Sequence, residues 1–133
     1  MIVFKKEYLD EIIKYCKKQI PNEACGILAG KDKKVYKVYK MTNIDASPVS
    51  YLMEPKEQFK VIKDLRKLSL EMIGIYHSHI NAPAKPSQKD IQMAFYSEVS
   101  YIIVSFENSN TIVKSFRINN GEVKKEIIKI ENE

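Results

Sequence analysis

The sequence predicts one α+β domain over residues 1–133, with a curved, mostly antiparallel or mixed β-sheet flanked by helices in an α/β/α-like arrangement. The length is that of a typical domain, and it suffices for a hydrophobic core that is stable without disulfide bonds or a structural metal ion. The composition, with 44% hydrophobic and 29% charged residues, is typical of a soluble globular protein. Strand and helix patterns are mixed without a regular βαβ rhythm, and hairpin signals are frequent, which favours the α+β class.

The first predicted elements are a short strand and an amphipathic helix. Residues 2–4 form an apolar run typical of a strand. Apolar residues then recur at helical spacing, with lysines on the opposite side, until Pro21 ends the helix. The apolar stripe consists of Leu9, Ile12, Ile13, Cys16 and Ile20. Because Cys16 lies on this stripe, we interpret it as a core residue.

A hairpin is predicted next. The small and apolar residues 24–30 indicate a buried strand, residues 31–33 a turn, and residues 35–41 a pairing strand with alternating side chains. Residues 43–50 are polar and are expected to form a loop. A short strand is expected to follow over residues 51–53.

Two more helices and four strands are predicted in the rest of the chain. Pro55 suits the first turn of a helix, whose wide apolar face would consist of Phe59, Val61, Ile62, Leu65, Leu68 and Met72. Residues 73–79 predict a strand, and Ser87 opens a helix expected to run to about Ser97. Further strands are predicted over residues 101–106, 111–118 and 122–130, with an Asn-Asn-Gly turn before the last.

Composition also narrows the function classes. Lys and Arg outnumber Asp and Glu by 22 to 17, a formal charge of +5 that suits an acidic partner. The lysines are scattered and no aromatic–basic RNA-binding motif occurs, so nucleic acid is not expected as a partner. No apolar run has the length of a membrane span and the N-terminus is soon charged, so we expect a cytoplasmic protein without membrane association. Cys16 and Cys25 lack CxxC spacing and are expected to be reduced.

The two histidines of the chain, His77 and His79, lie together at the end of a predicted strand. Side chains alternate along a strand, so both imidazoles share one face with Ile73 and Ile75. Two neighbouring imidazoles can bind one metal ion, and Asp90 on the following helix can add a carboxylate. This set leaves a zinc ion one open position for water, which is the arrangement of a catalytic site.

The same residues also have a simpler interpretation. Ser87-x-x-Asp90 is the pattern of an N-terminal capping box, with Asp in place of the more usual Glu. Histidines are, moreover, often ordinary core or surface residues. The two interpretations stay open at this point and are compatible, because a capping Ser87 would fix the helix end that carries Asp90.

A hydrolytic zinc site also needs a general base that is not itself a ligand. Glu23 is the one carboxylate that borders a buried strand near small residues, although an exposed strand start often carries a Glu as well. Cys25 would share a face with Glu23 in an extended strand. It is interpreted either as a neighbour of the zinc or inhibitory thiol, or as a small buried residue, which is the commoner case.

These residues resemble the motif of the JAMM (MPN+) zinc metallopeptidases, also called the Mov34/MPN/PAD-1 or JAB domain family. That motif is an upstream Glu, then His-x-His, seven residues, Ser, two residues and Asp. Here His77-Ser78-His79 precedes seven residues, Ser87, two residues and Asp90, and Glu23 opens a segment similar to the family's first strand segment. The resemblance covers nearly the whole chain and implies the cytidine-deaminase-like JAMM/MPN architecture in its minimal, prokaryotic form.

The resemblance implies a role for each residue of the motif. His77, His79 and Asp90 would bind one Zn²⁺ ion per chain. Glu23 would take a proton from the water on the zinc and pass it to the leaving amine, and Ser87 would stabilise the oxyanion. The reaction implied is hydrolysis of a peptide or isopeptide bond.

The implied substrate is a small ubiquitin-like or sulfur-carrier protein, cut after its C-terminal Gly-Gly. Ile80 stands where bacterial relatives commonly have Pro, so residues 80–86 are where substrate choice is expected to differ.

Two alternative functions are a non-catalytic MPN-type interaction module and a DNA-associated RadC-like JAMM domain. The first lacks the ligands that this chain keeps, and the second has a Pro-Ser-Gly loop that this chain lacks. The oligomeric state, a homodimer included, is left open.

Overall fold

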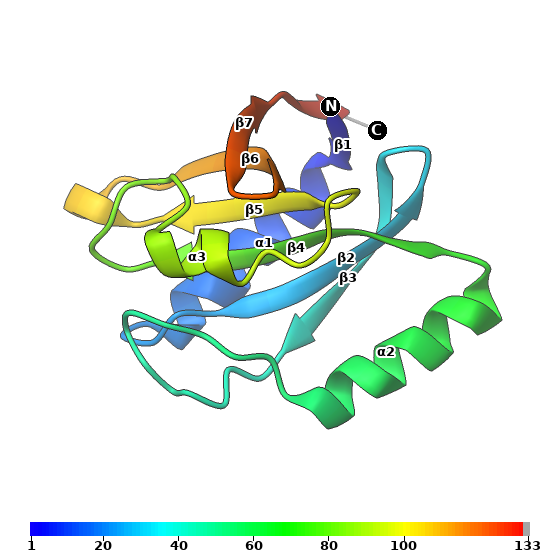
Figure 1. Ribbon diagram of the computed structural model, residues 1–133, viewed down its shortest axis with the longest axis horizontal. Coiled ribbons are helices and arrows are strands. Elements are labelled where there is room, and N and C mark those ends of the chain that lie inside the picture. The colour runs from blue at the N-terminus through cyan, green and yellow to red at the C-terminus, as the bar shows by residue number, and fades with distance from the viewer. Residues whose placement is uncertain (132–133) are drawn as a thin grey trace.

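The computed structural model describes residues 1–131, in which eight strands form one sheet of order β7-β6-β5-β4-β2-β3-β1-β8 (Figure 1). The strands are β1 (Ile2–Lys5), β2 (Cys25–Lys31), β3 (Lys34–Met41), β4 (Glu71–His79), β5 (Ser100–Ser105), β6 (Ile112–Asn119), β7 (Glu122–Glu126) and β8 (Ile128–Glu131). The helices are α1 (Lys6–Gln19), α2 (Pro55–Leu68), α3 (Gln88–Gln92) and the 3-10 turn η1 (Glu107–Ser109). None of the helices within residues 1–131 is long and apolar enough to cross a membrane.

The sheet is mixed, as the sequence predicts. Strand β2 pairs antiparallel with both β3 and β4, and β5, β6 and β7 form an antiparallel meander. The pairs β4–β5, β1–β3 and β1–β8 are parallel. Strand β4 therefore lies near the middle of the sheet, between β2 and β5, and its buried C-terminal end carries the two histidines.

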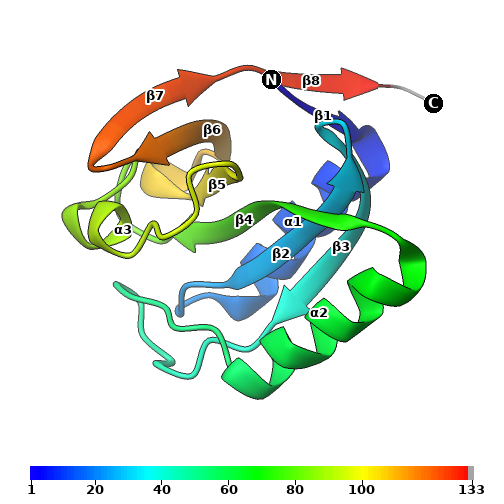
Figure 2. The same ribbon diagram turned by 45° about the vertical axis from the view of Figure 1, so that its right-hand side comes forward.

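The sheet curves until its two edges approach each other (Figure 2). Strands β7 and β8 stand at opposite ends of the strand order, yet Ile127 alone separates them in the chain. The expectation of a single strand over residues 122–130 is therefore wrong. Pairing with β6 ends at Glu126, and pairing with β1 begins at Ile128. The amide of Ile2 donates a hydrogen bond to the carbonyl oxygen of Ile127 at 3.0 Å, which directs the chain to β1.

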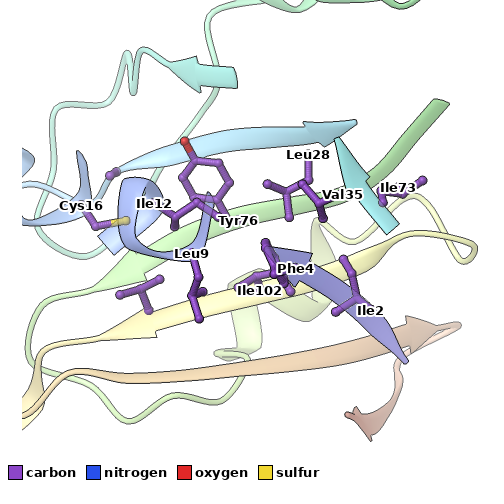
Figure 3. Packing of buried hydrophobic residues seen from close by; sticks show 12 residues of the cluster. Ile2, Phe4, Leu9, Ile12, Cys16, Leu28, Val35, Ile73, Tyr76 and Ile102 are labelled. Atoms are coloured by element: carbon purple, nitrogen blue, oxygen red, sulfur yellow. The ribbon is translucent and has the colours of Figure 1, made fainter. Parts of the chain in front are cut away.

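Two long helices cover opposite faces of the sheet. The buried side of α1 packs on the face shown in Figure 3, and Cys16 belongs to this core as expected. This cluster includes Ile2, Phe4, Leu9, Ile12, Cys16, Leu28, Tyr76 and Ile102. On the other face, Val61 and Leu65 of α2 pack against Cys25 and Ile27. A third cluster under α3 contains Ala84, Val99, Tyr101, Ile103, Phe116 and Ile118.

The apolar face of α2 is only partly buried. Phe59, Ile62 and Leu68, which belong to the predicted apolar face, are 60%, 50% and 46% exposed. The helix contacts the sheet through the stripe of Val61 and Leu65, and Met72 belongs to β4 rather than to the helix.

The structure corrects three local expectations. Helix α3 ends at Gln92 rather than near Ser97, because the Tyr101 hydroxyl binds the backbone N–H and C=O of Tyr96. Residues 51–53 form only one isolated bridge, Asn43 with Met53.

The third correction concerns Ile73, which does not share a face with Ile75. The pairing of β2 with β4 shifts between Leu28 and Ala29, which leaves Ile73 as the extra residue of a bulge. Its side chain therefore joins the core under α1, whereas Ile75 packs on the α2 side.

Candidate metal centre

The two histidines lie at the buried end of β4, on one face of the strand. His77 and His79 are 2% and 3% exposed, and their Nε2 atoms are 3.1 Å apart. Asp90 approaches from α3, with its Oδ2 3.1 Å from Nε2 of His77 and 3.0 Å from Nε2 of His79. Three atoms capable of binding a metal thus converge from two elements.

The start of α3 holds Asp90 in place. The Ser87 hydroxyl accepts a hydrogen bond from the amide of Asp90 at 3.1 Å, and the Ser87 amide donates to Asp90 Oδ2 at 2.9 Å. This is the capping box that the sequence pattern indicates. Capping and the approach to the histidines therefore coexist in the same two residues, and the cap fixes the carboxylate.

The hydrogen bonds of this group fit a cation at its centre. Nδ1 of His79 lies 2.8 Å from the carbonyl oxygen of Pro83, so Nδ1 carries the proton and Nε2 presents a lone pair. Asp90 Oδ2 is also an acceptor when ionised. Zinc bonds of 2.0–2.1 Å in a tetrahedral set place ligand atoms about 3.3 Å apart, close to the separations found here. Two imidazoles and one carboxylate are a zinc-type donor set.

Ionisation of these groups follows from burial and their mutual contacts. Burial lowers the pKa of His77, which favours the neutral imidazole that binds metals. Burial opposes ionisation of Asp90, but hydrogen bonds with His77 and His79 outweigh it and hold its pKa well below the usual range. Burial also opposes protonation of His79, but its contacts with Asp90 and the Pro83 carbonyl raise its pKa overall.

Glu23 lies beside the histidines through the pairing of β2 with β4. Cys25 is opposite His77, and the Ser78 amide binds the carbonyl oxygen of Ala24 at 3.1 Å, which extends the pairing beyond β2. This register places Glu23 opposite His79 on the same face of the sheet. Glu23 is 6% exposed, and burial raises the pKa of its carboxyl to about 7. The nearby His79 lowers this pKa slightly, and the charge of Asp90 raises it slightly.

Ser78, the variable residue between the two histidines of the motif, has a structural role. Its side chain points to the opposite face of β4 from the two histidines, and its Oγ accepts a hydrogen bond from the Ala24 amide at 2.8 Å. This bond ties the residue after Glu23 to β4. Strand alternation predicts the direction of Ser78, but its partner lies 54 positions earlier and leaves no local signal.

Two residues of the loop between β3 and α2 also reach the site without having been predicted. The ring of Tyr51 stacks on the imidazole of His77, with centroids 4.6 Å apart and planes at 26°. Asn43 donates a hydrogen bond to the carbonyl oxygen of Glu23 at 3.0 Å. The sequence predicted a polar loop around Asn43 and a short strand around Tyr51, and no spacing rule singles out either residue.

A groove of about 210 Å³ opens next to Asp90. Its lining is largely apolar and includes Val49, Leu52, Met93, Phe95 and Tyr96. Val49 and Phe95 are 80% and 73% exposed, so the groove has an apolar rim. The groove gives the metal-binding residues a neighbouring surface on which an extended chain can lie.

Cys25 belongs to the packing between β2 and α2. It is fully buried in the cluster with Val61 and Leu65, and burial raises the pKa of its thiol to about 12. A protonated thiol is a poor metal ligand. Cys25 is also outside the group of residues whose ligand atoms converge. These observations favour the interpretation of Cys25 as a small buried residue.

Comparison with known proteins finds a matching family model and similar peptidases. Residues 5–119 match the family model described as prokaryotic homologs of the JAB domain. The chain is 29% identical over 133 residues to the CysO-cysteine peptidase of Mycobacterium tuberculosis, covering 98% of this chain and 91% of that protein. It is 36% identical over 104 residues to the desampylase of Pyrococcus furiosus, covering 78% of this chain and 74% of that one.

Solved structures agree in fold. A solution structure of a Desulfitobacterium hafniense protein superposes with a TM-score of 0.89 at 38% identity, covering 100% of this chain and 94% of that one. The crystal structure of a JAB1/MPN domain protein from Archaeoglobus fulgidus superposes with a TM-score of 0.64 at 17% identity, covering 98% of both chains. The second likeness concerns the fold alone.

Proposed function

This chain belongs to the prokaryotic homologues of the JAB domain, the JAMM family, and from that membership we propose that it is a zinc-dependent peptidase or isopeptidase. Its substrate would be a small ubiquitin-like or sulfur-carrier protein, hydrolysed after the C-terminal Gly-Gly. The observation that carries the proposal is the convergence of His77, His79 and Asp90 beside the buried carboxyl of Glu23.

His77, His79 and Asp90 would hold the metal ion. Zinc bound there would supply a Lewis acid and lower the pKa of a bound water to about 7. The chain contributes the fixed positions of these three side chains. Neutral His77 offers a lone pair, the contact of His79 Nδ1 with the Pro83 carbonyl turns its Nε2 toward the metal position, and the Ser87 amide keeps the carboxylate of Asp90 turned toward both.

Glu23 would move the proton. A carboxyl with a pKa of about 7 accepts a proton readily at neutral pH and also releases it, as an acid–base catalyst must. It would take the proton of the attacking water and deliver it to the nitrogen of the leaving amine. The amide C–N bond breaks in that step, and the products are a free carboxylate and an amine.

Ser87 would stabilise the negative oxygen that forms on the substrate carbonyl. Its Oγ accepts the hydrogen bond from the Asp90 amide, which leaves the hydroxyl hydrogen free to donate. The groove beside Asp90 would receive the extended tail of the substrate. The names of the relatives, a CysO-cysteine peptidase and a desampylase, support small carrier or ubiquitin-like proteins as the substrate class. The net positive charge suits acidic carriers of this kind.

A cleavage assay tests this proposal. Zinc-loaded protein is incubated with small Gly-Gly proteins that carry a C-terminal peptide or amino-acid adduct, and release is followed by mass spectrometry. Glu23→Gln should reduce the release rate by at least about 10²-fold, because the proton carrier is lost. Glu7→Gln, an exposed carboxylate on α1, serves as the matched control and should leave the rate unchanged. Release by Glu23→Gln at the wild-type rate would contradict the mechanism.

Metal analysis separates the enzyme from a non-catalytic module of the same fold. The purified protein should contain about one zinc ion per chain, bound through one donor set of two imidazoles and a carboxylate. Protein that takes up no zinc, and whose stability does not respond to a chelator, would favour the interaction module instead.

A further inference from the structure

The loop between β3 and α2, residues 42–54, reaches the candidate site from outside the JAMM motif (Figure 1). We call this loop the strap. We propose that the strap positions two residues of the site at once: its Asn43 holds the backbone of Glu23, and its Tyr51 holds the ring of His77. The inference rests on the proposed function, because it assigns positioning residues to that same site.

The Asn43 side chain is bonded entirely to backbone groups. Its Nδ2 donates to the carbonyl oxygens of Glu23 and Ser50, each at 3.0 Å. Its Oδ1 accepts from the amides of Asp45 and Leu52, also at 3.0 Å. Two donors and two acceptor sites are the full capacity of an amide side chain. Asn43 therefore fixes the strap internally and joins it to the segment that carries Glu23.

The backbone of Glu23 is held by the strap on both sides of its Cα. Its amide donates to the carbonyl oxygen of Ser47 at 2.8 Å, and its carbonyl accepts from Asn43. Glu23 precedes β2, so regular sheet hydrogen bonds do not hold it. The direction of its carboxyl therefore depends on these two bonds and on the Ala24–Ser78 contact next to it. A displacement of about 1 Å at a catalytic group can cost about 10²-fold in rate.

His77 lacks the usual hydrogen bond that orients a metal-binding imidazole. Its Nδ1 is buried and has no hydrogen-bond partner among residues 1–131, whereas Nδ1 of His79 contacts the Pro83 carbonyl. Metal-binding histidines almost always donate this second nitrogen to an acceptor. The stacked ring of Tyr51 takes over that function, since it covers one face of the imidazole and restricts its rotation.

One side chain supports both contacts. Two of the three backbone groups that Asn43 binds within the strap, the carbonyl of Ser50 and the amide of Leu52, belong to the residues on either side of Tyr51. Asn43 thus fixes both peptide units next to the stacking ring while it also binds Glu23. The proton carrier and the first histidine consequently share one support that neither strand pairing nor the motif provides.

The first test measures metal affinity without substrate. Metal-free wild type, Tyr51→Leu and Tyr51→Phe compete with a chromophoric chelator for Zn²⁺, and the visible spectrum of the Co²⁺ forms reports the ligand geometry. Tyr51→Leu should bind zinc about 10–100-fold more weakly, with a weakened or shifted Co²⁺ spectrum. Tyr51→Phe keeps the ring and should stay within about 3-fold of wild type. Wild-type affinity and spectrum in Tyr51→Leu would overturn the role of Tyr51.

The second test uses the shared support. Asn43→Ala should also weaken zinc binding, and the loss in the Asn43→Ala/Tyr51→Leu double variant should be clearly smaller than the product of the two single losses. Zinc-saturated Asn43→Ala should lose about 10–100-fold in kcat with KM within about 3-fold, because Glu23 is misplaced. Independent losses in the double variant, or an unchanged kcat, would overturn the proposal.

Tyr39→Phe is the matched control for a general loss of stability. It removes the hydrogen bond from Tyr39 to Asp64, which joins β3 to α2 away from the site, and should leave zinc affinity and kcat unchanged. A wild-type protein that binds no metal would overturn the proposed function itself, and the strap with it. Metal binding and cleavage by wild type, together with unaffected strap variants, would overturn the strap alone.

Discussion

Glu23 shows how burial prepares one residue for its task. An exposed glutamate is ionised at neutral pH, whereas burial beside His79 and Asp90 raises the pKa of this carboxyl to about 7. The group thereby becomes able to take up and release a proton under the same conditions. The cost is a carboxylate that destabilises the fold whenever it is ionised without compensation.

This cost predicts a pH-dependent effect on stability in the metal-free protein. The folded pKa of Glu23 lies above its unfolded value of about 4.3, so between these values the folded state binds more protons and its stability falls as pH rises. Glu23→Gln removes this loss. Urea unfolding should show the variant gaining stability relative to wild type between about pH 5 and pH 8. A difference between the two proteins that does not vary with pH would contradict the shifted pKa.

Four residues of the motif, His77, His79, Ser87 and Asp90, were identifiable from the sequence because their relations are local, whereas the role of Glu23 came from the family resemblance. Alternation along β4 aligns His77 with His79, and the three-residue spacing of Ser87 and Asp90 is that of a capping box. Tyr51 and Asn43 were not identifiable, because their partners are 26 and 20 positions away and belong to other elements. Such contacts depend on the path of a loop, which periodicity does not determine.

At the scale of elements, sequence patterns located most helices and strands but not where backbone pairing changes. The bulge that turns Ile73 toward α1 depends on the partner strand β2. The early end of α3 depends on the Tyr101 hydroxyl, a side chain of the following strand. The split of the last predicted strand at Ile127 depends on β1, at the other end of the chain. The errors at Ile73 and Ile127 arose from strands distant in sequence, and the error at α3 arose from a side chain outside the repeating pattern of the helix.

The close contact of β2 with β4 gives a prediction at this scale. A Cβ on Gly26 would lie 2.1–2.2 Å from the ring and hydroxyl of Tyr76, which is fully buried and donates to the carbonyl oxygen of Tyr39. Gly26→Ala should therefore lower the free energy of unfolding by about 1–3 kcal/mol, because the Tyr76 ring must move. Chemical denaturation measures this change.

Gly121→Asn provides the control for the substitution of a glycine. Gly121 has a φ of 80° in the turn before β7, and a Cβ at this position would meet no other atom within 4 Å. Asparagine tolerates that backbone conformation, so the loss should stay below about 1 kcal/mol. Equal losses at both glycines would contradict the steric explanation for Gly26.

For the whole molecule, the predicted α+β class with a curved mixed sheet is confirmed, and membership of the JAMM family agrees with it. The approach of the two sheet edges to each other was not predictable in detail, because β8 returns to β1 across nearly the full length of the chain. The C-terminal end of β4, the start of β2 and α3 lie on the same side of the molecule (Figure 1). Cys25 of β2 pairs with His77 of β4, and Asp90 of α3 contacts the imidazole of His77.

Because the proposed metal would join β4 to α3, its removal should be visible in the stability of the whole protein. A ligand that binds only the folded state stabilises it by about 2.7 kcal/mol at 100 times its Kd. Chelation of the zinc-loaded protein should therefore lower Tm by about 5–10 °C for a domain of this size.

The His79→Ala variant lacks one of the three converging ligand atoms and should show a much smaller shift. Thermal scans with and without chelator measure both values. An equal shift in the two proteins would place the responsible metal elsewhere, and no shift in wild type would contradict a structural link between β4 and α3 through this site.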